Sequence, residues 1–143
     1  MVSLKVCVIG MSLALFAINV EAGKIVEMQV KTDTEPDSEM DNGGFLHMAI
    51  CGTTQCCQMI NLDTQFNDFQ QGAVDSFVGQ YLQNCDNFEL EDDSLKALLV
   101  THRGDDAWNG EWIRILLDSG KFFNCAGPGW LDNDEFANVQ CTP

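Results

Sequence analysis

The clearest chemistry in this sequence is the binding of a divalent cation by closely spaced carboxylates. The acidic residues concerned lie in three polar stretches and comprise Asp33, Asp37, Glu39 and Asp41, then Asp105 and Asp106, and finally Asp132 and Asp134. Calcium takes several hard oxygen ligands, so acidic residues from more than one loop have to converge on it. The alternative interpretation is a solvated acidic surface that only keeps the protein soluble, because the spacing is not that of an EF-hand loop.

Three tryptophans, Trp108, Trp112 and Trp130, form the second set of candidate functional residues. Tryptophan is common where a protein meets a membrane, because its ring is apolar and its N–H can stay hydrated. Trp112 alternates with Ile113 and so points away from the face that Ile113 buries, while Trp130 follows Gly129 at an expected loop tip. We therefore predict that Trp112 and Trp130 contact a membrane or partner, with ordinary packing as the alternative, and that Trp108 lies in the core.

His102 is followed closely by Asp105 and Asp106, which are the residue types of a general base held by a carboxylate. A hydrolase would also need a nucleophile or a metal-bound water. The sequence contains neither Gly-x-Ser-x-Gly nor His-Glu-x-x-His, and its other histidine is His47. Cys56-Cys57 is not followed by His and Asp at the spacing of secreted phospholipases. We therefore interpret His102 as a structural residue at a strand end and expect no catalysis.

The first 22 residues have the pattern of a signal peptide. Lys5 precedes an apolar run over Val6 to Val20, and small residues at Val20 and Ala22 predict cleavage after Ala22. The mature domain would then span residues 23–143, and an uncleaved anchor is the alternative. The run is short for a membrane-spanning helix, which needs about 20 residues. We therefore expect a secreted, extracellular protein and not an integral membrane protein.

Cleavage would remove one of the seven cysteines and leave an even number. The remaining cysteines are Cys51, Cys56, Cys57, Cys85, Cys125 and Cys141. An even number after a signal peptide predicts a disulfide framework, and no zinc-site spacing competes with it. Sequence alone does not choose among the pairings. We expect Cys125–Cys141, because both flank the C-terminal segment, and no Cys56–Cys57 bond, because a vicinal disulfide strains the peptide.

The formal net charge of -15 argues against some classes of binding partner and in favour of others. Cleavage after Ala22 leaves it unchanged, because Lys5 and Glu21 are removed together. So acidic a chain is not expected to bind nucleic acid, whose phosphates need Lys and Arg, or to dock by simple electrostatics on anionic membranes. The charge favours basic partners or divalent cations.

Alternating apolar residues predict an all-β domain. The expected strands are Ile25–Lys31, Phe45–Cys51, Cys57–Leu62, Val74–Val78, Phe88–Leu90, Leu95–Thr101, Ile113–Leu117, Lys121–Cys125 and Val139–Cys141. Asn109-Gly110 and Gly127-Pro128-Gly129 are expected to be turns or breaks, and Phe66 and Phe69 are candidate plugs in a polar connection. Around eight short strands with frequent turns predict an antiparallel, eight-stranded, two-sheet sandwich.

Several segments occur in an order that one family shares. An acidic, glycine-containing loop precedes an alternating strand, and Asp75-Ser76-Phe77 follows it. Next come an apolar strand that ends in His102, Trp108 five residues ahead of Ile113, and a segment from Cys125 to Trp130-Leu131. From about Ile25 to Cys141 this order resembles the PLAT domain, named for polycystin, lipoxygenase and alpha-toxin, which is similar to C2 domains.

The resemblance implies a non-catalytic module that binds membranes, lipids or protein partners, in some members with calcium, and it implies that the acidic loops share one end of a sandwich. The family often has Gly-Thr-Asp-Ala before its second strand, and that aspartate can be a calcium ligand. Here the stretch is Asp41-Asn42-Gly43-Gly44, with glycine at that position. Asp41 or Asn42 would have to substitute for the aspartate.

We therefore expect a disulfide-stabilised binding module for lipid or membrane surfaces, with calcium as its candidate cofactor. The candidate calcium ligands are Asp41, Asn42, Asp105 and Asp106. The alternative function is that of an extracellular protein-interaction or effector protein, such as a venom, secretion or matrix component, with no lipid role. A small hydrolase is the third hypothesis.

Overall fold

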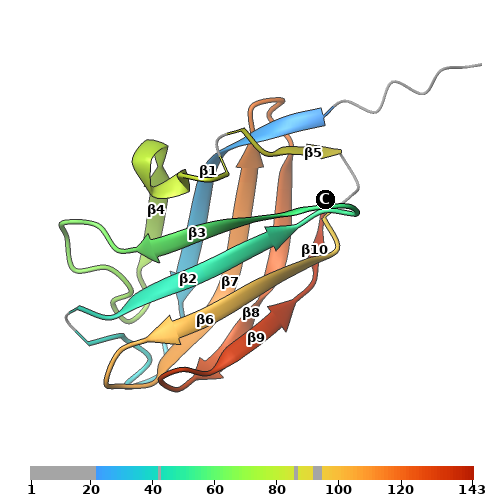
Figure 1. The fold of residues 1–143 in the computed structure, drawn as a ribbon. Coiled ribbons are helices and arrows are strands. Elements are labelled where there is room, and N and C mark those ends of the chain that lie inside the picture. Colours follow the sequence, from blue (N-terminus) through green and yellow to red (C-terminus); the bar gives the residue numbers. More distant parts are fainter. Residues whose placement is uncertain (1–21, 42, 86, 92–94) are drawn as a thin grey trace, which may run out of the picture.

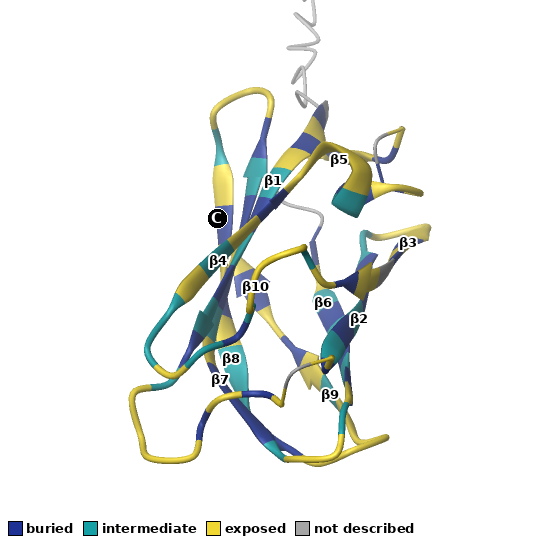
Figure 2. Cartoon of the chain, turned by 90° about the vertical axis from the view of Figure 1, so that its left-hand side faces the viewer, coloured by how far each residue is buried: buried dark blue, intermediate teal, exposed yellow. Residues whose placement is uncertain are grey.

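The computed structural model describes residues 22–41, 43–85, 87–91 and 95–143 and forms two facing antiparallel sheets (Figures 1 and 2). The larger sheet follows the order β10-β8-β7-β1-β4, with β5 also paired to β1, and the smaller sheet follows the order β3-β2-β6-β9. The larger sheet contains β1 (Ala22–Thr32), β4 (Val74–Val78), β5 (Glu89–Glu91), β7 (Trp108–Leu117), β8 (Phe122–Leu131) and β10 (Cys141–Thr142). The smaller sheet contains β2 (Phe45–Cys51), β3 (Cys56–Leu62), β6 (Ala97–Arg103) and β9 (Phe136–Val139), and a short 3-10 helix, η1 (Gly79–Leu82), follows β4.

Period-two alternation places the apolar residues of each strand in the space between the sheets. In β2, Leu46, Met48 and Ile50 are buried, while the residues between them are half-buried. Met48 pairs with Val100 of β6, which is also buried, so neighbouring strands contribute to the same layer. Burying one such side chain stabilises the fold by about 1.5–3 kcal/mol. The all-β sandwich that the alternation predicts is confirmed.

An aromatic cluster occupies one part of this core. The Trp108 ring is fully buried, and its indole N–H donates to Thr32 Oγ1 at 3.0 Å. Phe69 packs edge-on against Trp108, with ring centroids 5.8 Å apart, and stacks on Phe77 at 5.7 Å. The predictions that Trp108 lies in the core and that Phe69 is a plug are confirmed. The corresponding prediction for Phe66 is wrong, because its side chain is 73% exposed.

The expected breaks at Asn109-Gly110 and Gly127-Pro128-Gly129 are wrong, because these residues lie within β7 and β8. Gly110 pairs with Gly129, next to a bulge that precedes Trp112. A Cβ on Gly127 would lie 2.0 Å from the Gly110 carbonyl oxygen, and a Cβ on Gly110 would lie 2.5 Å from the Trp108 ring. The glycines therefore allow two strands to approach closely over a large buried ring, and they do not form a turn.

The C-terminal segment also differs from the expectation. Val139–Cys141 was predicted as one strand, but the chain ends β9 at Val139 and starts β10 at Cys141 in the other sheet. This crossing brings Cys141 directly opposite Cys125, and the predicted Cys125–Cys141 disulfide is confirmed. The described part of the chain consequently has more strands than the eight or so expected.

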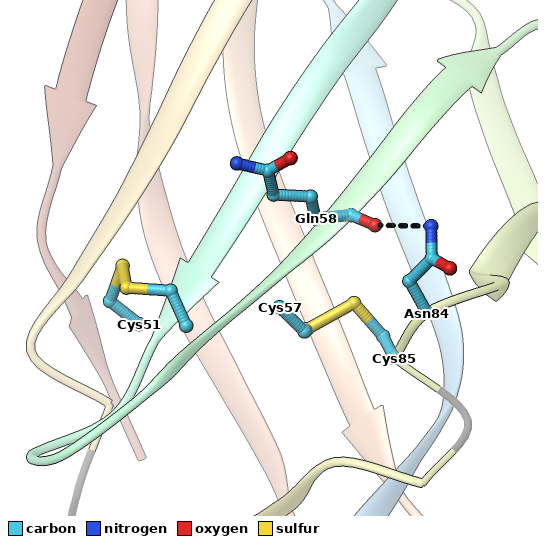
Figure 3. Close-up of a disulfide and its surroundings, with 6 residues drawn as sticks. Cys51, Cys57, Gln58, Asn84 and Cys85 are labelled. Carbon is cyan, nitrogen blue, oxygen red and sulfur yellow. Dashed lines mark hydrogen bonds between the residues drawn. A yellow bond between two sulfur atoms is a disulfide. The ribbon is translucent and has the colours of Figure 1, made fainter.

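The other two disulfides are Cys51–Cys56 and Cys57–Cys85, so the expectation that Cys56 and Cys57 do not bond to each other is confirmed. Figure 3 shows the Cys57–Cys85 bond beside a hydrogen bond of 3.3 Å from Asn84 Nδ2 to the Gln58 carbonyl. In the described ranges, no helix has the length and apolar character needed to cross a membrane.

Candidate functional site

Four loops lie toward one end of the sandwich, and three of them form the lower left of Figure 1 and the bottom of Figure 2, while the loop between β3 and β4 lies above them at the left of Figure 1. The four loops are residues 33–44 between β1 and β2, 63–73 between β3 and β4, 104–107 between β6 and β7, and 132–135 between β8 and β9. We call these four loops, together with the adjoining strand residues Trp130 and Phe136, the acidic end. The antiparallel order of the strands explains why loops so distant in sequence share one end.

Hydrogen bonds from backbone N–H groups join these loops to one another. Met40 N donates to the Phe69 carbonyl at 3.1 Å, which links the first loop to the second. Gly104 N donates to Asn133 Oδ1 at 3.4 Å, which links the third loop to the fourth. The first loop also meets the start of β7, because Asn109 N donates to the Ser38 carbonyl at 3.1 Å.

A depression of about 500 Å³ lies between the first, third and fourth loops. The residues that line it are Asp41, Gly43, Gly44, Phe45, Arg103, Gly104, Asp105 and Asn133. The structure thus brings together two of the four predicted calcium ligands, Asp41 and Asp105. Asp106 does not line the depression, and its carboxylate accepts a hydrogen bond of 2.9 Å from Ala107 N. Asn42 lies outside the described residues.

Arg103 is a lining residue that the sequence analysis did not single out. It ends β6 and forms an ion pair with Asp134, and both side chains are substantially exposed, at 47% and 61%. The pair ties the third loop to the fourth and places a positive charge beside Asp41 and Asp105. Nothing in the local sequence pattern signals this arrangement, because it depends on the pairing of β6 with β9.

His102 lies directly beneath this depression. Its ring is fully buried, and a Cβ built on Gly104 would lie 3.0 Å from His102 Nε2. Burial lowers the pKa of His102 below 6.5, against the opposing influence of the Asp132 backbone and of the Asp132, Asp106 and Asp41 carboxylates. Neither ring nitrogen has a hydrogen-bond partner of normal geometry among the described residues. The buried position next to the end of β6 fits the predicted structural role.

The lining of the depression matches the ligand preference of calcium in part. Asp41, Asp105 and Asn133 offer hard oxygen atoms of the kind that calcium prefers. They are fewer than the six to eight ligands of a typical site, so water would have to complete the set, and Arg103 adds a competing charge. Within the described ranges, no cluster of three or more His, Cys, Asp or Glu side chains is positioned to hold a metal ion. The donor atoms therefore fit calcium in kind, and they are too few to hold it by protein atoms alone.

Three aromatic side chains are exposed at the acidic end. Phe66 lies in the second loop and is 73% exposed, while Phe136 follows the fourth loop and is 67% exposed. Trp130 is 47% exposed, but it lies within β8, where it pairs with Asn109, and not at a loop tip as expected. Phe66 and Phe136 were not predicted as contact residues. For Phe136, the signal that could have found it is a single large apolar residue among polar neighbours shortly before an expected strand, whereas Phe66 shares its polar loop with the buried Phe69 and has no such signal.

Trp112 lies apart from this group, in the middle of β7 on the outer face of the larger sheet. It is half-buried, and the Arg114 guanidinium lies 5.2 Å from the centroid of its ring. The same guanidinium lies 5.1 Å from the centroid of Phe122. The structure therefore does not bring Trp112 together with Trp130 or with the acidic residues of the depression.

No protein-family model and no curated protein matches this sequence. Solved structures do match the fold. The alpha-toxin of Clostridium absonum matches at a TM-score of 0.65 with 14% identity, and the alpha-toxin of an avian strain of Clostridium perfringens at 0.64 with 16%. A coral 8R-lipoxygenase, described as activated by calcium through a C2-like domain, matches at 0.64 with 17%.

These matches establish the fold. They cover 85% of this chain for the two toxins and 82% for the lipoxygenase, but only 32% and 17% of those longer proteins. The resemblance to the PLAT domain is thus confirmed at the level of the β-sandwich. The chain therefore corresponds to about a third or less of each of these longer proteins.

Proposed function

We propose that this protein is a secreted, non-catalytic module that attaches to lipid surfaces through its acidic end, with calcium assisting the attachment. The observation that carries the proposal is the exposure of Phe66, Phe136 and Trp130 at the acidic end, where other loops supply Asp41 and Asp105 to the depression. Soluble proteins rarely expose several large apolar side chains at one end of a domain, and where they do, these side chains usually contact a partner or a membrane.

Insertion of these rings into a lipid surface would supply the free energy of binding. Moving one large apolar side chain from water into an apolar environment contributes about 1.5–3 kcal/mol, and Phe66 and Phe136 are exposed enough to be transferred. Trp130 suits the boundary between headgroups and acyl chains, because its indole N–H can stay in water while the ring is buried. Part of this gain is lost to the immobilisation of the protein.

Calcium would reduce the negative charge at the acidic end of a protein whose formal net charge is -15. An ion held by Asp41 and Asp105 would offset two carboxylates and offer its remaining positions to phosphate oxygens of a headgroup. In the coral lipoxygenase with a similar fold, calcium activation is attributed to the C2-like domain. Lipid attachment of this chain should accordingly depend on calcium.

Co-sedimentation with phosphatidylcholine vesicles tests the proposal. The oxidised protein should pellet with vesicles in calcium and stay in solution with chelator. The double substitution Phe66→Ser and Phe136→Ser should abolish pelleting, since it removes both exposed phenylalanines of the acidic end. Phe122→Ser is the matched control, because Phe122 is 43% exposed on the outer face of the larger sheet. Equal loss in the control and the double variant would contradict the assignment of the surface.

Asp105→Asn tests the calcium component, with Glu89→Gln in β5 as a control carboxylate outside the acidic end. Asp105→Asn should raise the calcium concentration needed for pelleting, and Glu89→Gln should not. Pelleting that is the same in calcium and in chelator would remove calcium from the mechanism. An absence of pelleting in both buffers would refute lipid attachment.

The second candidate function is the capture of a basic extracellular protein. The observation that favours it is the excess of 22 Asp and Glu over 7 Lys and Arg. Such a complex would weaken steeply as salt rises, because screening acts on exposed charges. Salt-sensitive binding to a basic protein, without any pelleting of vesicles, would support this function in place of the first.

A further inference from the structure

Two of the three disulfides join residues that face each other across paired strands. Cys51 is the register partner of Cys56 in β2 and β3, and Cys125 is the register partner of Cys141 in β8 and β10. The Cα–Cα distance is 4.0 Å in both. The two disulfides therefore join neighbouring strands with the same geometry. They differ in their surroundings, so one serves as a control for the other.

The surroundings differ in access from solvent. Cys56 is exposed and Cys51 is half-buried, whereas Cys125 and Cys141 are only 2% and 7% exposed. Figure 3 shows Cys51 near the end of the β2–β3 ribbon. A thiolate has to reach a sulfur atom from outside to exchange with a disulfide, so exposed disulfides are the labile ones. Access therefore favours exchange at Cys51–Cys56.

A shallow apolar depression begins two residues along the strands from this disulfide, on the outer face of the smaller sheet. It has a volume of about 270 Å³, and Ala49, Gln58 and Leu99 are among its lining residues. Gln58 is two residues from Cys56, and Ala49 is two residues from Cys51, so both side chains point to the same face as the cysteines. The rise along a strand places them about 7 Å from the disulfide. A small substituent on Cys56 would thus lie beside an apolar surface.

The charge distribution also distinguishes this hairpin. No Asp, Glu, Lys or Arg occurs between Gly44 and Asp63, although the whole chain has a net charge of -15. The tip of the hairpin faces Glu89 and Glu91 of β5 across a second depression of about 230 Å³. An uncharged or cationic thiol would therefore approach more readily than an anionic one.

We propose that Cys51–Cys56 is a thiol-exchange site that captures small, uncharged, apolar thiols on Cys56. The thiolate of the ligand attacks Cys56 Sγ and forms a new S–S bond, while the Cys51–Cys56 bond breaks and Cys51 leaves as a thiolate that takes a proton from water. No net oxidation occurs in this step, because one disulfide replaces another. The apolar body of the ligand lies in the depression lined by Ala49, Gln58 and Leu99.

The fold can tolerate this exchange. β2 remains paired with β6 along its whole length, from Phe45–Arg103 to Cys51–Ala97, and Cys57–Cys85 continues to tie down β3. The Cys51–Cys56 bond spans a sequence separation of only 5, so it restricts the unfolded chain less than the other two. Exchange is therefore a local event in a folded protein.

The test is a brief exposure of the folded, oxidised protein to benzyl mercaptan, followed by alkylation of free thiols and mass mapping. The expected product has benzyl mercaptan on Cys56 and the alkyl group on Cys51. The Cys125–Cys141 bond is the internal control, and exchange at Cys51–Cys56 should be at least about tenfold faster. Equal rates at the two bonds, or adduct only under conditions that unfold the protein, would overturn the proposal.

Two further arms isolate the role of the depression. The adduct with benzyl mercaptan should form in higher yield at equilibrium than the adduct with 2-mercaptoethanol, a polar thiol. Leu99→Asn should remove that preference while exchange itself persists, and circular dichroism should show an intact sandwich. Equal yields for both thiols in the unsubstituted protein would refute the binding surface. Neither result depends on vesicle attachment, so failure here is separable from failure of the lipid-binding function.

Discussion

The two ends of the smaller sheet are organised by different kinds of interaction. At the acidic end, carboxylates serve as local hydrogen-bond acceptors, as when Asp33 accepts from Glu35 N at 2.9 Å and Asp132 from Asn133 N at 2.7 Å. At the other end, the tip of the β2–β3 hairpin carries no ionised side chain and is closed by Cys51–Cys56. One strand, β2, connects both ends.

This difference means that the two ends should respond to different variables. Hydrogen bonds to carboxylates and exposed charges depend on pH, on salt and on divalent cations. A disulfide depends on the thiols around it and is indifferent to moderate salt. If both proposals hold, this small domain has one end that responds to ions and one end that responds to thiols, with a shared core between them.

The largest expected effect is that of Trp108→Ala, which removes the ring on which the acidic end rests. Trp108 is fully buried and bonds to Thr32 Oγ1. The cavity should lower the free energy of unfolding by about 3–5 kcal/mol, as measured by urea denaturation. Trp112→Ala, at a half-buried ring on the outer face, is the control and should cost much less. Similar losses in both variants would show that Trp108 is not the principal support of this end.

Removing the Cys57–Cys85 and Cys51–Cys56 disulfides one at a time tests how much each one stabilises the hairpin end. Replacing Cys57 and Cys85 by alanine opens a sequence separation of 28 and should cost about 3.5 kcal/mol by the loop-entropy relation. Replacing Cys51 and Cys56 opens a separation of 5 and should cost about 2 kcal/mol. Urea denaturation of the two double variants provides the measurement. A greater loss for Cys51 and Cys56 would mean that their bond is structural and not free to exchange.

Most of the fold follows from local patterns in the sequence. Phe45–Cys51 and Val74–Val78 were predicted with the observed bounds, because clean alternation and flanking turn residues define such strands. The errors arise where a long-range contact overrides a local signal. Gly110 and Gly127 read as turn residues, but their missing side chains serve the close approach of β7 to β8 over Trp108.

The candidate site was less accessible to sequence reasoning. The convergence of Asp41 and Asp105 followed from the resemblance to a known sandwich, not from spacing. Arg103 and Asn133 join them only through the pairing of strands far apart in the chain, which no local pattern encodes. Exposure of Phe66 could not be separated from burial of Phe69, because both are phenylalanines in the same polar loop and only packing against Trp108 distinguishes them.

The acidic end should lose stability on mild acidification through His102. Burial lowers the folded-state pKa of His102 below the value of 6.5 expected for the unfolded chain. As pH falls below about 6.5, the unfolded state takes up a proton that the folded state does not, so the free energy of unfolding falls. This fall in the free energy of unfolding is at most about 1.4 kcal/mol per pH unit, and it stops once the pH reaches the pKa of His102 in the folded protein.

Urea denaturation between pH 7.5 and 5.5, with chelator present, measures this slope. His102→Gln should flatten it, because the variant has no imidazole at that position. His47→Gln, on the outer face of the smaller sheet, serves as the substitution control. A slope that persists in His102→Gln would assign the pH dependence to the carboxylates, and the buried histidine would then have no part in the response of this end.

Arg103→Gln should have the smallest effect on stability. It tests directly whether the acidic end, unlike the disulfide-linked hairpin, is free of a fixing bond. The Arg103–Asp134 pair is substantially exposed, so its loss should change the free energy of unfolding by less than about 1 kcal/mol. The same substitution removes a positive charge that lines the depression with Asp41 and Asp105, and calcium should therefore bind more tightly in isothermal titration. Arg114→Gln, at a cation on the outer face of the larger sheet, should leave the calcium affinity unchanged. If Arg103→Gln instead destabilised the protein as much as loss of Cys51–Cys56, the acidic end would be held by its ion pair. The ion pair would then fix the loops in place, as the Cys51–Cys56 disulfide fixes the β2–β3 hairpin, and the loops could not rearrange around an ion.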